Sequence, residues 1–248
     1  MKVKEILNLI NSFAPAGTAL GYDNVGVLVG NPAEEVTKAV VCLDATPSAV
    51  EFATKNSAQL IITHHPVIFD GLKAVTAGSP VYECIKNGIS VISAHTNLDV
   101  AEGGVNDCLA KALGLKNITA VTDDEGFSFR KGILSEEMSA EGFARYIKSR
   151  LGGVVRYTDS KTTIKTVSVC GGSGGSELEL AKTVSDALVT ADVKHSTLIY
   201  ANQINFSIFD AGHYHTENVV INPLAERLSK MAEGVEFLPF SGNEIKTV

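Results

Sequence analysis

The sequence predicts an α/β protein with two lobes: a mainly parallel sheet with flanking helices, and a second α+β lobe. The chain has 248 residues, of which 45% are hydrophobic, so it is long enough to bury two cores. Short apolar runs alternate with amphipathic segments, an order typical of parallel sheets. The alternation changes character near residue 118. We therefore expect a first lobe over 1–117 and a second lobe over 118–217. Residues 218–248 are candidates to complete the first lobe.

The first lobe opens with apolar residues at helical spacing from Val3 to Phe13, and Pro15 ends this pattern. The apolar run 39–43 predicts a strand. Thr46 and Pro47 then predict the start of a helix, because threonine caps a helix N-terminus and proline suits its first turn. Strands at 60–62 and 89–92 and helices at 79–88 and about 106–114 continue the alternation.

The second lobe is expected to contain a helix near 139–151 between the alternating segments 127–130 and 154–157. Further strands are predicted at 167–170, 188–190 and 206–209, with a helix through 198–200 and a long helix to about residue 233. Ser176 and Glu179 have the spacing of a capping box. The glycine turn 171–175 before that helix suits either an anion or tight packing, and we favour packing because the full G-x-G-x-x-G pattern is absent.

The composition excludes several classes of partner. Lys plus Arg is 21 and Asp plus Glu is 28, which gives a formal net charge of -7, so the surface has no general attraction for nucleic acid or anionic membranes. No apolar run approaches the roughly 18 residues that a membrane span requires. We expect a cytoplasmic protein without a membrane or nucleic-acid partner. The four scattered cysteines form no C-x-x-C pair and are expected to be reduced core thiols.

Five of the six histidines lie in three clusters, and each cluster follows an apolar strand. The clusters are Thr63-His64-His65-Pro66, Ala94-His95-Thr96-Asn97-Leu98-Asp99, and Asp210-Ala211-Gly212-His213-Tyr214-His215-Thr216-Glu217. Ligands in open α/β sheets bind at the carboxyl ends of strands, where these segments are expected. Imidazole and carboxylate are the ligand types that zinc, iron and manganese accept. The pattern therefore indicates a metal site.

The candidate ligands are His64, His65, Asp99, His213 and Glu217. A catalytic mononuclear zinc usually has three protein ligands, so five favour two divalent ions, zinc, iron or manganese, with Asp99 or Glu217 as a bridge. If the turn after Gly212 enters a helix, His213 and Glu217 share one face and can point at one ion. Hydrogen-bonded loop residues are the alternative explanation.

Other polar residues near these clusters have two interpretations each. His95 is the candidate proton-transfer group, and a structural hydrogen bond is its alternative. His195 is either a second-lobe contribution to the site or an ordinary polar residue. Asp23 caps a turn or lines a cavity, and Asp44 orients a ligand histidine or caps the next helix. His215 should point away from the site.

The segments GYDNVGVLVG, THHP, AHTNLD, CGGSGGS, TADVKH and DAGHYHTE occur in this order over nearly the whole chain. In them the chain resembles the Nif-three-like dinuclear metal centre family, whose members are also named homologues of GTP cyclohydrolase 1 type 2. Position by position, the resemblance implies metal binding by the same five residues. It also implies a two-lobed α/β subunit and a ring-shaped hexamer whose site faces the interior cavity. Tyr22, Ala191 and Ser196 depart from common family residues, which bears on substrate preference more than on metal binding.

Two classes of function follow from these observations. The first is a metal-dependent hydrolase for a small-molecule substrate, with opening of the GTP imidazole ring suggested by the family name and phosphoester hydrolysis as the runner-up. The ions would give the acidic chain the positive centre that an anionic substrate needs. The second class is a non-catalytic metal carrier, or a hexameric scaffold that binds a regulatory partner.

Overall fold

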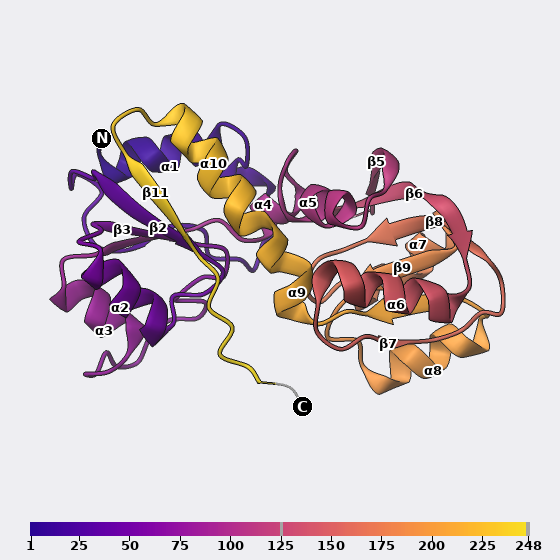
Figure 1. Cartoon of the computed structure of the whole chain (residues 1–248). Helices are drawn as coiled ribbons and strands as arrows, with labels where there is room; N and C mark the ends of the chain where they lie inside the picture. The colour runs from indigo at the N-terminus through magenta and orange to yellow at the C-terminus, as the bar shows by residue number, and fades with distance from the viewer. Residues whose placement is uncertain (125, 247–248) are drawn as a thin grey trace. The chain divides into compact units, whose positions relative to one another are not determined.

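The computed structural model describes residues 1–124 and 126–246 of the chain (Figure 1). Residue contacts divide it into two compact units. Unit 1 contains Met1–Glu102 and Ile221–Glu244, and unit 2 contains Gly103–Val220 with the described tail residues 245–246. Unit 1 is therefore built from two separate stretches of sequence. None of the helices in the described residues has the length and apolar character that crossing a membrane requires.

Unit 1 is a five-stranded sheet with helices on both faces. The strand order is β1-β4-β3-β2-β11, in which β4, β3, β2 and β11 run parallel and β1 is antiparallel to β4. Its strands are β1 (Gly26–Val29), β2 (Lys38–Cys42), β3 (Leu60–Thr63), β4 (Ser90–Ser93) and β11 (Glu236–Phe240). Its helices are α1 (Val3–Asn11), α2 (Pro47–Lys55), α3 (Pro80–Lys86), α4 (Thr96–Val100) and α10 (Ile221–Met231), with a 3-10 turn η1 (Ala16–Thr18).

The helix starts of unit 1 confirm the capping signals in the sequence. The Thr46 side chain accepts a hydrogen bond from the Ala49 backbone N–H at the start of α2, and Ser79 accepts one from Tyr82 at the start of α3. Pro47 and Pro80 occupy the first turns, where no intrahelical N–H is needed. As Figure 1 shows, α2 and α3 lie on one face of the sheet and α1 and α10 on the other.

Unit 2 contains a six-stranded mixed sheet with the order β5-β6-β8-β9-β10-β7. Neighbouring strands β8, β9 and β10 are parallel, whereas β5, β6 and β7 join by antiparallel pairing. Its strands are β5 (Lys116–Thr122), β6 (Ser128–Met138), β7 (Arg156–Tyr157), β8 (Ile164–Val169), β9 (Ala187–Thr190) and β10 (Ser207–Asp210). Its helices are α5 (Val105–Ala112), α6 (Ala140–Leu151), α7 (Leu178–Val184), α8 (His195–Gln203) and α9 (His213–Glu217), with 3-10 turns η2 (Gly175–Glu177) and η3 (Asn218–Val220).

Two apolar clusters cover the faces of this second sheet. One contains side chains of α5 and α6, with Phe143 of α6 packed edge-on against Phe209 of β10 at a ring-centroid distance of 5.0 Å. The other contains side chains of α7 and α8 with Leu188 and Ile208 from the sheet. Alternate residues of one strand thus serve opposite faces. The fold is the α/β class that the sequence predicts, with four adjacent parallel strands in the first sheet and three in the second.

Two local predictions were wrong. The expected capping box at Ser176 and Glu179 does not form, because the chain first makes the 3-10 turn η2 and the Ser176 hydroxyl donates to Glu177 instead. The expected single long helix after residue 209 is divided into α9, η3 and α10. Pro223 explains this division, since proline has no N–H for the carbonyl four residues earlier, that of Val219, and its ring crowds that carbonyl.

The four cysteines are free and buried, as the sequence predicts. Burial raises the pKa of the Cys84 thiol to about 11, and it raises that of Cys108 to about 11 as well. The thiol is therefore the stable form at neutral pH, which suits core packing and not metal binding or nucleophilic chemistry.

Candidate metal centre

The three central strands of unit 1 deliver polar residues to one edge of the sheet. Strands β2, β3 and β4 are parallel neighbours, so their carboxyl ends lie side by side. Asp44 follows β2, His64 and His65 follow β3, and His95 follows β4. The backbone N–H groups of His64 and His65 donate to the carbonyls of Cys42 and Leu43, which extends the pairing of β3 with β2 past the end of the strand.

His64 is buried with an oxygen atom near each of its ring nitrogens. Its Nδ1 lies 3.0 Å from the carbonyl oxygen of Ala94, and its Nε2 lies 3.5 Å from Oδ1 of Asp99. Asp99 itself is buried on α4, which begins directly after His95. The carbonyl contact makes Nδ1 the protonated nitrogen and leaves the lone pair on Nε2, the atom that faces the carboxylate.

An aspartate lies against Nδ1 of His65, where His64 has a carbonyl oxygen. Its Nδ1 lies 2.8 Å from Oδ1 of Asp44, while the next helix, α2, is capped by Thr46. Of the two roles that the sequence allows for Asp44, the structure therefore shows the contact with histidine and assigns the cap to another residue. The carboxylate fixes the ring so that Nε2 is the atom able to bind a ligand.

His95 is held by Asp23, which the sequence analysis assigned to a turn or to a cavity. Oδ1 of Asp23 lies 2.8 Å from Nδ1 of His95, and Oδ2 accepts hydrogen bonds from the Thr96 N–H and hydroxyl at the start of α4. Burial alone raises the pKa of Asp23, but the hydrogen bonds from His95 and Thr96 outweigh it and hold that pKa well below its usual range. Asp23 is thus a carboxylate that positions both a ring and a helix terminus.

The three imidazoles of unit 1 form one cluster. Ring centroids lie 4.9 Å apart for His64 and His65, 5.1 Å for His64 and His95, and 5.6 Å for His65 and His95. One nitrogen of each ring lies within 4.8 Å of the others, which is close enough for a single metal ion. The structure therefore brings together four of the predicted residues, His64, His65, His95 and Asp99, in unit 1.

In unit 2 the corresponding edge carries the other two predicted ligands. Gly212, with a positive φ of 84°, turns the chain from β10 into α9, so His213 and Glu217 stand one helical turn apart, as predicted. Nε2 of His213 lies 2.9 Å from Oε2 of Glu217. Nδ1 of the same ring lies 2.7 Å from Oδ2 of Asp192, which follows the neighbouring parallel strand β9.

The glycine turn after β8 makes room for the Glu217 side chain. Gly172 has a φ of 61°, and a Cβ there would lie 2.1 Å from Oε1 of Glu217 and 3.3 Å from Cε1 of His213. The Gly172 carbonyl also accepts hydrogen bonds from the Ala191 N–H and the Thr190 hydroxyl, which attach the turn to the end of β9. The turn is therefore used for tight packing against a candidate ligand, the role that the sequence analysis favoured.

The residues present fit divalent metal ions. His213 has a carboxylate against each of its ring nitrogens, and His64 has a carbonyl on one side and a carboxylate on the other. A neutral imidazole has only one N–H, so its other nitrogen carries a lone pair. In both rings that lone pair faces an oxygen atom, and the two repel each other unless a proton or a metal ion lies between them. Asp99 and Glu217 are buried carboxylates, which proteins stabilise by pairing or by metal coordination. The described residues thus contain histidine and carboxylate groups that are able to hold a metal ion.

The two remaining histidines have other surroundings. Nδ1 of His215 lies 3.0 Å from the carbonyl oxygen of Leu151, and its ring packs against Gly153, in agreement with the expected structural role. His195 is the exposed first residue of α8. The residue that the sequence does not single out is Asp192, which occurs only within the segment TADVKH. One pattern was available: Asp44 precedes His65 by 21 residues, and Asp192 precedes His213 by the same number.

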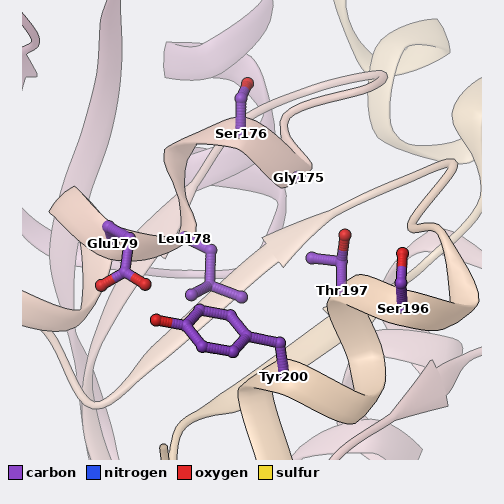
Figure 2. Close-up of a pocket in the computed structure, with 7 residues that line it drawn as sticks. All are labelled: Gly175, Ser176, Leu178, Glu179, Ser196, Thr197 and Tyr200. Carbon is purple, nitrogen blue, oxygen red and sulfur yellow. The ribbon is translucent and has the colours of Figure 1, made fainter.

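A cavity of about 320 Å³ in unit 2 is lined by Gly175, Ser176, Leu178, Glu179, Ser196, Thr197 and Tyr200. Figure 2 shows the Tyr200 ring beneath Leu178, with its hydroxyl turned toward the carboxylate of Glu179. That hydrogen bond raises the pKa of Tyr200. The cavity contains hydroxyl groups and one carboxylate but none of the predicted ligands.

Comparison with known proteins identifies the family of the chain. The family model described as Duf34/NIF3 (NGG1p interacting factor 3) matches residues 1–244. The chain belongs to this family. A protein of Clostridium perfringens named GTP cyclohydrolase 1 type 2 homolog is 33% identical over 251 residues, covering 96% of this chain and 95% of that protein. A protein of the same name from Methanocaldococcus jannaschii is 33% identical, covering 92% of this chain and 95% of the relative.

Solved structures of NIF3 relatives share the whole fold. The Staphylococcus aureus protein SA1388 superposes with a TM-score of 0.92 at 27% identity, covering 100% of this chain and 99% of that one. Reduced HcgD from Methanocaldococcus jannaschii gives a TM-score of 0.83 at 30% identity and covers 96% of this chain and 97% of its own. Both units of this NIF3 protein therefore follow an arrangement of elements that crystal structures already contain.

Proposed function

We propose that this NIF3 protein is a metal-dependent hydrolase that binds two divalent ions, and that His64, His65, Asp99, His213 and Glu217 are metal ligands. The proposal rests on the orientation of four imidazole rings. His64, His65, His95 and His213 each have Nδ1 against an oxygen acceptor, which leaves the lone pair of the ring on Nε2. Histidines that bind metal ions are characteristically oriented in this way. Four such rings on the ends of parallel strands are hard to explain as independent structural hydrogen bonds.

In the proposed centre the two buried carboxylates, Asp99 and Glu217, balance the charge of the ions, and either of them can serve as the bridge. The ions, zinc, iron or manganese, would supply Lewis-acid activation of water and of the electrophilic atom of the substrate. The chain has a net charge of -7, so the same ions would give an anionic substrate its positive partner.

His95 has the geometry of a proton-transfer group in this proposal. Asp23 holds the proton on Nδ1, so Nε2 is the atom that accepts a proton from the attacking water and later releases it. The ring neighbours His64 and His65, which keeps Nε2 close to the proposed ligands. We assign His95 this role in preference to that of a sixth ligand, because hydrolysis requires a base near the activated water.

The substrate class follows from the name of the relatives. We propose a phosphorylated small molecule, with hydrolytic opening of the imidazole ring of GTP tested first and a phosphoester panel second. We also propose assembly into a hexamer. Light scattering would then give a mass of about six times the 26.2 kDa of one chain, and a monomer would refute the assembly.

The decisive experiment combines metal analysis with turnover. Purified protein is loaded with Zn²⁺, Mn²⁺ or Fe²⁺, its metal content is measured, and hydrolysis of GTP and phosphoesters is followed for wild type and His65→Ala. The matched control is His215→Gln, whose amide can still donate to the Leu151 carbonyl. We expect two ions per wild-type chain, loss of metal and turnover in His65→Ala, and retention of both in the control.

The other outcomes have definite meanings. Turnover that persists in His65→Ala would come from a contaminant or another site and would refute the hydrolase. Two bound ions with no turnover of any substrate would instead support the metal carrier or the hexameric scaffold.

A further inference from the structure

The two units contain the same carboxylate–imidazole arrangement at corresponding places. In unit 1, Asp44 lies two residues beyond the end of β2, and His65 lies two residues beyond the adjacent parallel strand β3. In unit 2, Asp192 lies two residues beyond the end of β9, and His213 lies three residues beyond the adjacent parallel strand β10. The Asp-to-Nδ1 distances are 2.8 and 2.7 Å, and both sequence separations are 21 residues.

We propose that Asp44 and Asp192 are equivalent positioning residues for the two histidines that they contact. Each carboxylate accepts the Nδ1 proton of an imidazole on the neighbouring strand, which fixes both the ring rotation and the tautomer in which Nε2 is the metal-binding atom. The metal part of this inference rests on the proposed function, in which His65 and His213 are ligands. The tautomer part concerns the metal-free protein and can be tested without it.

The surroundings of the two carboxylates favour positioning over a structural role. The side chains of Asp44 and Asp192 are 48% and 57% exposed, so they hold no buried part of the fold in place. The α2 terminus next to Asp44 has its own cap in Thr46. Asp23 provides the contrast, because its side chain is fully buried and also holds the backbone of Thr96. Exposed ion pairs contribute little to stability, so removing Asp44 or Asp192 should leave the fold intact.

The backbone at Asp192 supports the same conclusion independently. Its φ of 50° lies in the left-handed region, which costs energy for a residue with a Cβ. The conformation is enforced on both sides, because the Ala191 N–H donates to the Gly172 carbonyl and the Val193 N–H donates to Oδ2 of Asp210. Backbone strain of this kind is concentrated at functional sites. Here it directs the Asp192 carboxylate to the His213 ring.

The first measurement is the tautomer of each ring in metal-free protein at pH 8. Long-range ¹H–¹⁵N spectra report which imidazole nitrogen carries the proton, and His65→Ala and His213→Ala assign the two signals. Wild type should show Nδ1–H at both rings. We expect Asp44→Ala to change His65 alone, toward a mixture of tautomers. Asp192→Ala should change His213 alone, toward Nε2–H, because Nε2 faces Oε2 of Glu217.

The second measurement is metal affinity by calorimetric titration with Zn²⁺ and Mn²⁺. Loss of a residue that orients a metal ligand costs roughly 10–100-fold in affinity, so each alanine variant should weaken binding by that factor at a metal-free melting temperature equal to wild type. Asp44→Asn and Asp192→Asn keep an oxygen acceptor and should recover most of the loss. Asparagine also tolerates a positive φ, so Asp192→Asn remains folded if the alanine variant does not.

The controls are two exposed acids without a histidine contact, Glu51→Gln on α2 and Asp159→Asn in unit 2, for which neither readout should change. Unchanged tautomers in both alanine variants would overturn the inference, and so would wild-type affinity in both. If wild type binds no metal, the proposed function fails, and the tautomer spectra still decide whether the two aspartates position the rings.

Discussion

Substitution of Gly172 by alanine tests whether the glycine turn exists to admit the Glu217 side chain. An added Cβ would lie 2.1 Å from Oε1 of Glu217, whereas real Cβ contacts shorter than 3.0 Å essentially never occur. The carboxylate must therefore move by about 1 Å. Metal–ligand distances tolerate only about 0.2 Å, so we expect Gly172→Ala to weaken binding of divalent ions by roughly 100-fold.

The cost to the fold should be smaller, because the end of a glutamate side chain moves more easily than backbone. The main contribution is the φ of 61°, which costs an L-residue about 1–2 kcal/mol and corresponds to a fall of roughly 2–8 °C in Tm. Metal affinity is measured by calorimetric titration with Zn²⁺, and stability by thermal unfolding of the metal-free protein. We expect a large loss of metal affinity together with only a small fall in Tm.

Gly175→Ala is the matched control in the same turn. Its added Cβ would meet only Cγ2 of Thr197 at 3.9 Å, an ordinary contact. We expect affinity and Tm close to wild type for this variant. If Gly172→Ala also bound metal as tightly as wild type, Glu217 would not be a ligand in the position described, and the argument from the glycine turn would be refuted.

Two further predictions concern acid stability and the thiols. Burial raises the pKa of Asp186, but hydrogen bonds from Thr166 and the Lys165 backbone outweigh it and leave that pKa below the ordinary value of an aspartate. Its stabilisation is therefore complete above the pKa of the unfolded chain, roughly 3.9, and is lost as the pH falls through the lower pKa of the folded protein. Urea unfolding should show Asp186→Asn about 1 kcal/mol less stable at pH 7, with the difference from wild type shrinking in acid; a constant difference would contradict this account. Ellman's reagent should find no rapidly reacting thiol in the folded protein and four after denaturation, because all four cysteines are buried; a fast thiol before unfolding would show that one of them is accessible.

The sequence predicts the parts of the fold that depend on local chemistry. Helix starts at Thr46 and Ser79 are encoded by side chains that cap their own helices, and they were placed correctly. The capping box at Ser176 failed, although its residue types are suitable, because the glycines before it allow a 3-10 turn that the pattern does not reveal. Spacing alone cannot distinguish these two uses of a serine.

In the candidate site, too, local features can be predicted from the sequence and tertiary contacts cannot. Histidines after apolar strands are visible in the sequence, because strand periodicity and residue type are both local properties. Asp44 is visible as a candidate partner because it also follows an apolar strand. The contact of Asp23 with His95 is not visible, since the two residues are 72 positions apart and meet only through the tertiary fold. Asp192 cannot be recognised from the sequence either, because its contact with His213 depends on the pairing of β9 with β10.

The division of unit 1 into two stretches of sequence has a consequence for biosynthesis. The main part of unit 2, Gly103–Val220, lies in one continuous stretch and can fold as soon as it leaves the ribosome, whereas β2 lacks its parallel partner β11 until the last part of the chain has been made. During that interval one side of β2 presents unpaired backbone groups, a template for association with other nascent chains. Shortened products that lack Glu236–Phe240 should therefore precipitate while still containing a correctly folded unit 2.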